Sequence, residues 1–194
     1  ALMQIEGATG IIHVIHDAIS PVASGEQEYL LAGQAEIQEK VNDLEFSLGW
    51  RSFFQSNPPA YAHMLRTARQ WVGHQEKILD LYCGVGSIGL SLEGNLIGVE
   101  AVPQAIEHAK RNAARLGRSA EFYCANSEDW PSLIERVVNE GPEKLLYISC
   151  NCNRFIEEYA TLQKAYRLVQ AQLYDFFPHT PHIETLMLLE KTKH

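Results

Sequence analysis

Residues 76–92, "EKILDLYCGVGSIGLSL", contain an apolar run, a glycine-rich turn and a second apolar run. From this stretch onward, short apolar runs alternate with amphipathic segments. This alternation is typical of strand and helix units that build a mostly parallel sheet. The sequence therefore predicts an α/β fold.

Working outward from this stretch, the chain divides into a main domain at 46–194 and a small β-rich part at 1–45. A helix is predicted at 103–117 because Pro103 opens the segment and Gly117 closes it. A loop, "SNPP", precedes one further helix. The other predicted helices are 131–141 and 153–165, and the predicted strands are 78–82, 96–100, 121–124, 145–149, 167–176 and 185–190.

Composition limits where the protein acts and what it binds. No apolar run reaches the roughly 18 residues of a membrane span, and the first residues lack the basic and apolar regions of a signal peptide. We therefore expect a cytoplasmic protein without membrane contact. The net charge of −8 argues against nucleic-acid binding by bulk attraction, although it leaves room for a local basic patch.

The cysteine pattern excludes two common metal frameworks. No two cysteines form a CxxC pair, so neither a zinc ribbon nor an iron-sulfur framework is expected. His179 and His182 form an HxxH pair that lacks a third ligand, so we predict no bound metal. In a reducing compartment cysteines remain free thiols unless one is a nucleophile. The four cysteines are Cys83, Cys124, Cys150 and Cys152.

The glycines within residues 83–89 follow an apolar strand, where they allow the backbone to approach a ligand closely. Glu100 ends the next strand, and a carboxylate there accepts hydrogen bonds from both ribose hydroxyls of an adenosine-type ligand. Asp80, without a phosphate-binding lysine nearby, favours S-adenosylmethionine over a nucleoside triphosphate or a dinucleotide. Asn126 follows the third strand, where an adenine contact is expected. The alternative is a plain tight turn beside a solvated strand end.

A second candidate site lies near the end of the chain. Cys150 follows the strand 145–149 at the carboxyl edge, where open α/β sheets bind ligands, and this position suits a nucleophile. The alternative is a packed thiol, since cysteine is often buried, but Asn151 and Asn153 favour a polar pocket. Glu184 begins a strongly apolar strand. A half-buried carboxylate there would have a raised pKa and could act as a base.

Three separated pieces together resemble one enzyme family. They are "SFFQSNP" at 52–58, "DLYCGVGSIGL" at 80–90, and "YISCN" at 147–151 with "DFFPHTPHIE" at 175–184. The combination resembles the RNA uracil-5-methyltransferases, which make 5-methyluridine in ribosomal and transfer RNA. The resemblance implies a Rossmann-like methyltransferase sheet that uses S-adenosylmethionine. "SFFQSNP" is closer to the ribosomal branch, so 23S ribosomal RNA is the expected substrate and transfer RNA the alternative.

The resemblance also assigns roles to individual residues. It makes Cys150 the nucleophile that adds to carbon 6 of uracil, and Glu184 the base that removes the proton from carbon 5. Cys152 is interpreted as structural. The residues that match the family's cofactor contacts are Gln55, Asp80, Gly84, Gly86, Glu100 and Asn126.

The chain departs from the family in what it lacks. The family's N-terminal RNA-binding barrel and the cysteine cluster of some members are missing. So is the strand with a DPPR-type motif between the third strand and the SCN strand, and we expect an omitted segment near 127–132. A catalytically silent RNA-binding or assembly module is therefore an alternative function, although the presence of both Cys150 and Glu184 argues against it.

Overall fold

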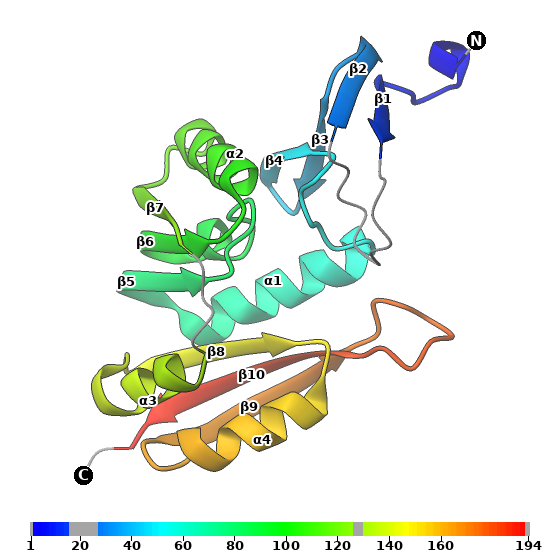
Figure 1. Ribbon diagram of the computed structural model, residues 1–194. Helices are drawn as coiled ribbons and strands as arrows, with labels where there is room; N and C mark the ends of the chain where they lie inside the picture. Colours follow the sequence, from blue (N-terminus) through cyan, green and yellow to red (C-terminus); the bar gives the residue numbers. More distant parts are fainter. Residues whose placement is uncertain (1, 16–26, 126–129, 193–194) are drawn as a thin grey trace.

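The computed structural model describes residues 2–15, 27–125 and 130–192 (Figure 1). Asn126 lies outside the described residues, as do residues 127–129, where an omitted segment was expected. In chain order the elements are η1 (Leu2–Gln4), β1 (Gly10–Ile15), β2 (Gln27–Gly33), β3 (Glu36–Val41), β4 (Leu44–Gly49), α1 (Pro58–Val72), β5 (His74–Leu81), η2 (Gly89–Ser91), β6 (Glu93–Glu100), α2 (Pro103–Arg115), β7 (Ala120–Cys124), α3 (Trp130–Glu140), β8 (Lys144–Ser149), α4 (Cys152–Leu162), β9 (Tyr166–Tyr174) and β10 (Glu184–Lys191).

The predicted α/β class and all the predicted helices and strands are confirmed, with ends shifted by a few residues. α2 begins at Pro103, as the proline-first pattern indicated. α1 begins at Pro58 because the side chain of Asn57 caps the helix, accepting a hydrogen bond from Ala60 N at 3.2 Å.

The strands of the main domain form two separate three-stranded sheets. β5, β6 and β7 are parallel and adjacent in that order, whereas β10 lies between β8 and β9 and is antiparallel to both. The expectation of a mostly parallel sheet therefore holds for the first sheet and is wrong for the second. After β9 the chain turns back through residues 175–183, and the returning strand occupies the space between its two neighbours.

Helices cover the sheets in layers (Figure 1). α1 packs on the face of the second sheet that carries Leu186, and α3 and α4 pack on the opposite face, which carries Met187 and Leu189. α2 packs against β6 and β7. In the described ranges no helix is long and apolar enough to cross a bilayer.

The β-rich N-terminal part consists of two hairpins, β1–β2 and β3–β4. β1 and β2 project away from the rest of the molecule in Figure 1. The β3–β4 hairpin contributes Val41, Phe46 and Leu48 to the main core and contacts α1 and α2. The proposed domain boundary after residue 45 falls inside this second hairpin and stays a prediction.

Candidate functional site

The glycine loop follows β5 at the carboxyl edge of the first sheet. Gly84 and Gly86 have φ angles of +54° and +83°, which side chains rarely tolerate. A Cβ atom at Gly86 would lie 2.9 Å from Leu90 Cδ1, whereas one at Gly84 would meet nothing within 4 Å. Tyr82 also has a positive φ, of 60°, and such strain in a non-glycine residue is typical of functional loops. Gly86 therefore serves packing, and Gly84 borders open space.

Glu100 lies at the end of β6, beside this loop, as predicted. Its Oε2 atom accepts a hydrogen bond from Gly84 N at 3.1 Å, and its Oε1 atom accepts one from Val102 N at 2.8 Å. A carboxylate has about four acceptor positions, so Glu100 retains capacity for a ligand hydroxyl. The pairing of β5 with β6 thus brings the acidic strand end and the glycine loop together.

Asp80 supports the loop from beneath. Its Oδ2 atom accepts a hydrogen bond from Gly89 N at 2.9 Å, and a Cβ atom at Gly89 would lie 2.7 Å from the same oxygen. Burial, and to a smaller extent the charge of Glu100, raises the pKa of Asp80 to about 6. The sequence placed Gly89 among the glycines that allow a close approach of the backbone to a ligand, and its hydrogen bond to Asp80 is a contact that the motif did not reveal.

Cys150 is exposed at the corner between β8 and α4. Ser149 Oγ donates to Asn151 O at 3.2 Å and accepts from Asn151 N at 3.0 Å. This hydroxyl therefore binds the backbone of the residue that follows Cys150. Asn151 caps α4 by accepting hydrogen bonds from Asn153 N and Arg154 N. Its side-chain oxygen is therefore used to cap the helix, and the polar pocket inferred from Asn151 and Asn153 stays a prediction.

Cys152, which the sequence suggested was structural, is the first residue of α4 and is exposed. It does not pack in the core, because the first turn of α4 places it at the surface.

Glu184 lies next to the last residue pair of β8 and β10 before the cysteine corner. The pairing ends with Ser149 opposite Thr185, so Cys150 and Glu184 each adjoin this pair in the sequence. Thr185 Oγ1 also donates to Ser149 O at 2.8 Å, a contact that sequence patterns could not reveal.

The Glu184 side chain is only 6% exposed, and burial raises the pKa of its carboxyl group. Glu184 shares its face of β10 with Leu186, which belongs to the same core cluster as Val85 of the glycine loop. Glu184 therefore shares its strand face with a residue of the core cluster to which the glycine loop also contributes.

Gln55 lies on the loop between β4 and α1. Its neighbour Phe54 is anchored by edge-on ring contact with Tyr61, at 5.5 Å between centroids, while Phe53 is 75% exposed. Gln55 Oε1 is buried and has no hydrogen-bond partner among the described residues. A buried acceptor without a partner is costly, so Gln55 Oε1 is a candidate to accept a hydrogen bond from a ligand.

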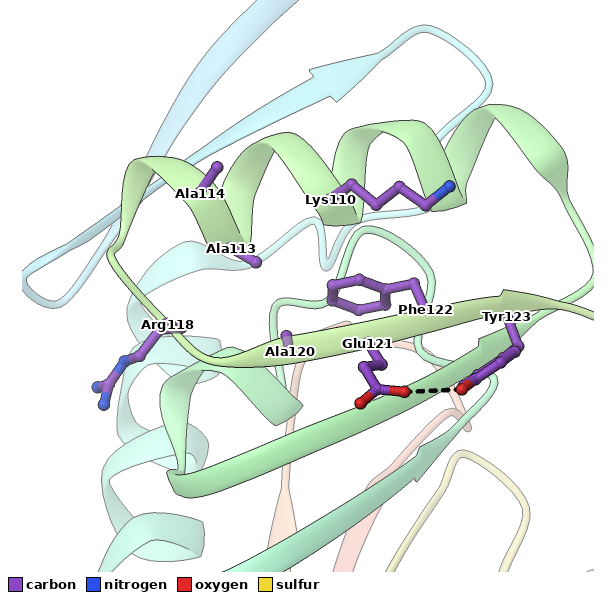
Figure 2. A pocket seen from close by; sticks show the side chains of 8 residues that line it. All are labelled: Lys110, Ala113, Ala114, Arg118, Ala120, Glu121, Phe122 and Tyr123. Carbon is purple, nitrogen blue, oxygen red and sulfur yellow. Dashed lines mark hydrogen bonds between the residues drawn. The ribbon is translucent and has the colours of Figure 1, made fainter.

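The cavities of the molecule do not coincide with these residues. The larger one, about 540 Å³, lies between α2 and the outer strand β7 and is lined by residues such as Lys110, Phe122 and Tyr123 (Figure 2). A smaller one, about 230 Å³, lies where α2 meets the turn after β4. Neither of these two cavities contains Cys150 or Glu184, and the shared pocket expected for these residues stays a prediction. Chemistry, rather than cavity size, locates the candidate site.

Comparison with known proteins agrees with these features. The sequence model of the tRNA (Uracil-5-)-methyltransferase family matches residues 133–192. The 23S rRNA (uracil(747)-C(5))-methyltransferase RlmC of Citrobacter koseri is 35% identical over 219 residues, which cover 99% of this chain and 57% of the relative. An uncharacterized RNA methyltransferase of Listeria monocytogenes is 32% identical over 223 residues, covering 97% of this chain and 49% of that protein. The chain thus spans about half the length of the curated relatives it matches.

Solved structures give the same answer for the fold. The tRNA (uracil-54, C5)-methyltransferase of Pyrococcus abyssi, in complex with S-adenosyl-L-homocysteine, superposes with a TM-score of 0.81 and 28% identity, covering 93% of this chain and 50% of that one. Trm5b of the same organism, 12% identical over 88% of this chain and 62% of its own, has a TM-score of 0.65 and shares only the fold. By sequence and by structure, this chain is similar to the RNA uracil-5-methyltransferases.

Proposed function

We propose that this chain is the catalytic part of an enzyme that methylates carbon 5 of a uridine in RNA. The observation that supports the proposal is the β8–β10 register, whose last pair, Ser149 and Thr185, directly adjoins the exposed thiol of Cys150 and the buried carboxylate of Glu184. A nucleophile and a base on neighbouring strand ends suit a reaction that needs addition to one ring carbon and deprotonation of the next.

The residues of the first sheet fit S-adenosylmethionine as the cofactor. Glu100 retains acceptor capacity for ribose hydroxyls, and Gly84 leaves open space above the loop. The unpartnered Oε1 of Gln55 suits an N–H donor, such as the amino group of the cofactor or the ring amide of uracil. When bound, the cofactor supplies the methyl group that is transferred to carbon 5, and this group is carried on a positively charged sulfur.

The chain's own residues perform the remaining steps. Cys150, as a thiolate, forms a bond to carbon 6 of uracil, and the electrons of the C5–C6 double bond move toward carbon 5 and oxygen 4. After methylation, Glu184 takes the proton from carbon 5. The electron pair left behind restores the double bond, the bond from carbon 6 to sulfur breaks, and Cys150 leaves as a thiolate. Burial of Glu184 raises its pKa, which makes its carboxylate a better proton acceptor.

Ribosomal RNA is the first substrate candidate, since the Citrobacter relative is named for 23S rRNA. Transfer RNA is the second, supported by the name of the matching family and by the Pyrococcus enzyme, which is named for uracil 54 of tRNA.

Trapping with 5-fluorouridine RNA tests the proposal. Fluorine at carbon 5 cannot be removed by a base, so the RNA should remain covalently attached to Cys150 in the presence of cofactor. We expect a shifted band on a denaturing gel with a 23S rRNA fragment, and a weaker one with a transfer RNA. Cys150→Ala should abolish the band, whereas the matched control Cys152→Ala, at an exposed thiol two residues away, should keep it. A band that survives in Cys150→Ala would exclude this mechanism.

A further inference from the structure

Among the described residues, four surrounding elements each contribute one side chain that hydrogen-bonds to the glycine loop, residues 83–89. Three of these side chains bond to the loop backbone, and the fourth bonds to the side chain of Ser87. The four residues are Asp80 of β5, Glu100 of β6, Asn112 of α2 and Tyr61 of α1. Asp80 and Glu100 were predicted to bind the cofactor, whereas Tyr61 belongs to none of the sequence motifs.

The contact between Tyr61 and Ser87 is short and almost completely removed from water. Tyr61 Oη and Ser87 Oγ lie 2.6 Å apart, and either hydroxyl can be the donor. Tyr61 is 2% exposed and Ser87 is 9% exposed. Burial raises the pKa of Tyr61 above its ordinary value, so its hydroxyl remains protonated at neutral pH. Because a buried hydroxyl that loses its partner is costly, each of the two groups keeps the other in place.

Ser87 lies between the glycine turn and η2. It follows Gly86, whose φ angle is +83°. Gly86 N donates to Cys83 O at 2.8 Å, and Gly86 O accepts from Leu90 N at 2.9 Å. These backbone bonds act within the loop and fix its shape. The Tyr61–Ser87 bond acts between two elements and fixes the position of the loop relative to α1.

Tyr61 also contacts the segment that carries Gln55. α1 is capped by Asn57, so Gln55 lies only two residues before the cap. Tyr61 N donates to Asn57 O at 2.9 Å, and the rings of Tyr61 and Phe54 meet edge-on with their centroids 5.5 Å apart. The same residue therefore bonds to the glycine loop and packs against the neighbour of Gln55.

The segment between β9 and β10, which leads to Glu184, meets the same tyrosine ring. Phe176 is 2% exposed and lies edge-on to Tyr61, with 6.3 Å between the ring centroids. Asn57 Nδ2 donates to Phe176 O at 3.3 Å. The start of α1, which crosses the middle of the molecule in Figure 1, therefore contacts all three of these segments: the glycine loop, the loop before α1 and the segment before β10.

We propose that Tyr61 is a positioning residue for the cofactor. Its hydroxyl, acting through Ser87, holds the glycine loop in a fixed position relative to the loop that carries Gln55, and its ring holds both beside Phe176. A loop that is already in the binding arrangement loses less conformational entropy when the ligand binds. The inference rests on the proposed cofactor site and adds to it a residue that acts through Ser87.

The affinity for S-adenosyl-L-homocysteine, measured by isothermal titration calorimetry, tests the proposal. Tyr61→Phe keeps the ring contacts and removes only the hydroxyl, and Ser87→Ala removes the other half of the bond. Each variant should bind about fivefold more weakly than the unmodified chain, which is the typical contribution of one hydrogen bond between neutral groups. Because both changes break the same bond, the double variant should bind no more weakly than either single variant.

The matched control is Tyr166→Phe. Tyr166 is 1% exposed, and its hydroxyl donates to Pro142 O at 2.7 Å and to Val137 O at 3.2 Å, within the core cluster under α3 and α4. This variant loses a comparable buried hydrogen bond that does not involve the glycine loop. Its affinity should stay within about twofold of the unmodified chain, since distant sites act independently.

Amide hydrogen exchange in the ligand-free chain tests the same bond without the cofactor. In Tyr61→Phe, residues 83–89 should exchange about fivefold faster than in the unmodified chain, because the loop opens more easily without this bond. Tyr166→Phe should leave their exchange unchanged. If the unmodified chain does not bind S-adenosyl-L-homocysteine, that result counts against the proposed function, and the exchange rates still decide whether Tyr61 holds the loop.

Three results would overturn the inference. The first is that Tyr61→Phe matches the unmodified chain in affinity or in the exchange of residues 83–89. The second is that the losses of affinity add up in the double variant, since Tyr61 and Ser87 would then act separately. The third is an equal loss of affinity in Tyr166→Phe, which would assign the effect to stability in general. If Tyr61→Phe does not fold, Ser87→Ala carries the same measurements from the loop side of the bond.

Discussion

Two corners of this molecule carry a cysteine after an apolar strand, and they differ in almost every physical respect. Cys83 follows β5 and is 6% exposed. Burial, followed by the charges of Asp80 and Glu100, raises the pKa of its thiol to about 12. Cys150 follows β8, is exposed, and sits directly before the Asn151 cap of α4.

The difference shows how the surroundings decide the chemistry of one residue type. Cys83 packs against the neighbouring strand, so closely that a Cβ atom at Gly98 would lie 2.9 Å from its sulfur. Two carboxylates nearby further disfavour its thiolate, so Cys83 is a packing residue beneath the cofactor loop. Cys150 is exposed and follows the last β8–β10 pair, beside which the buried Glu184 begins β10.

The largest expected effect separates these two thiols. Cys150→Ala should lower the rate of methyl transfer by at least ~10³-fold, because the covalent route is lost. Cys83→Ala should keep activity within a few-fold and lose only packing energy. Iodoacetamide should label Cys150 in the folded protein and reach Cys83 only after unfolding, as read by mass spectrometry. Labelling of Cys83 at the same rate as Cys150 would break the comparison.

A second prediction concerns Glu184, the proposed base. Glu184→Gln should lower turnover by about 10² to 10⁴-fold, the usual contribution of a positioned base, and RNA should accumulate covalently on Cys150. In the wild type, activity should rise with pH through the pKa of Glu184, which burial places above the ordinary value for a glutamate. Glu190→Gln, near the far end of the same strand, is the control. Unchanged turnover in Glu184→Gln would remove its assigned role.

The free energy of unfolding should depend on pH through Asp80, which lies next to the glycine loop. Folding raises the pKa of Asp80 from 3.8 to about 6. The stability that protonated Asp80 contributes is therefore fully present below pH 3.8 and is lost as the pH rises through about 6. Asp80→Asn cannot ionise and can still accept from Gly89 N. Relative to wild type, its free energy of unfolding should therefore increase by up to about 3 kcal/mol between pH ~4 and ~7. Urea denaturation at both pH values measures this, with Glu107→Gln as an exposed control; a constant difference between Asp80→Asn and wild type would contradict the prediction.

The smallest expected effect concerns the helix cap beside Cys150, at the corner between β8 and α4. Asn151→Ala should cost ~1 kcal/mol of stability, because it removes the acceptor for the first N–H groups of α4. Asn153→Ala, within the first turn of α4 and exposed, should change stability by less than about 0.5 kcal/mol. Equal losses in the two variants, measured by thermal denaturation, would mean that Asn151 is not the cap that holds the corner.

Much of the candidate site was predictable because its signals are local. A glycine-rich turn after an apolar strand, with an acidic residue at the end of the next strand, indicates a cofactor loop wherever two parallel strands pair. The hydrogen bond from Gly84 N to Glu100 confirms that pairing. By contrast, the burial of Cys83 and the capping role of Asn151 were not predictable, since thiols and amides occur in both polar and packed surroundings.

By itself, the sequence determined the α/β class, the elements and their order, because the periodicity of apolar residues and the proline and glycine positions act within a few residues. It also supplied Cys150 and Glu184 as candidates, through motifs that survive in short stretches. Only the tertiary structure decided that β10 lies between β8 and β9, and hence that the strand beginning with Glu184 pairs with the strand that leads to Cys150. Strand order and register depend on contacts between residues far apart in the chain, which no local pattern encodes. The same holds for the outer edges of β5 and β8, each of which is paired on one side only among the described residues.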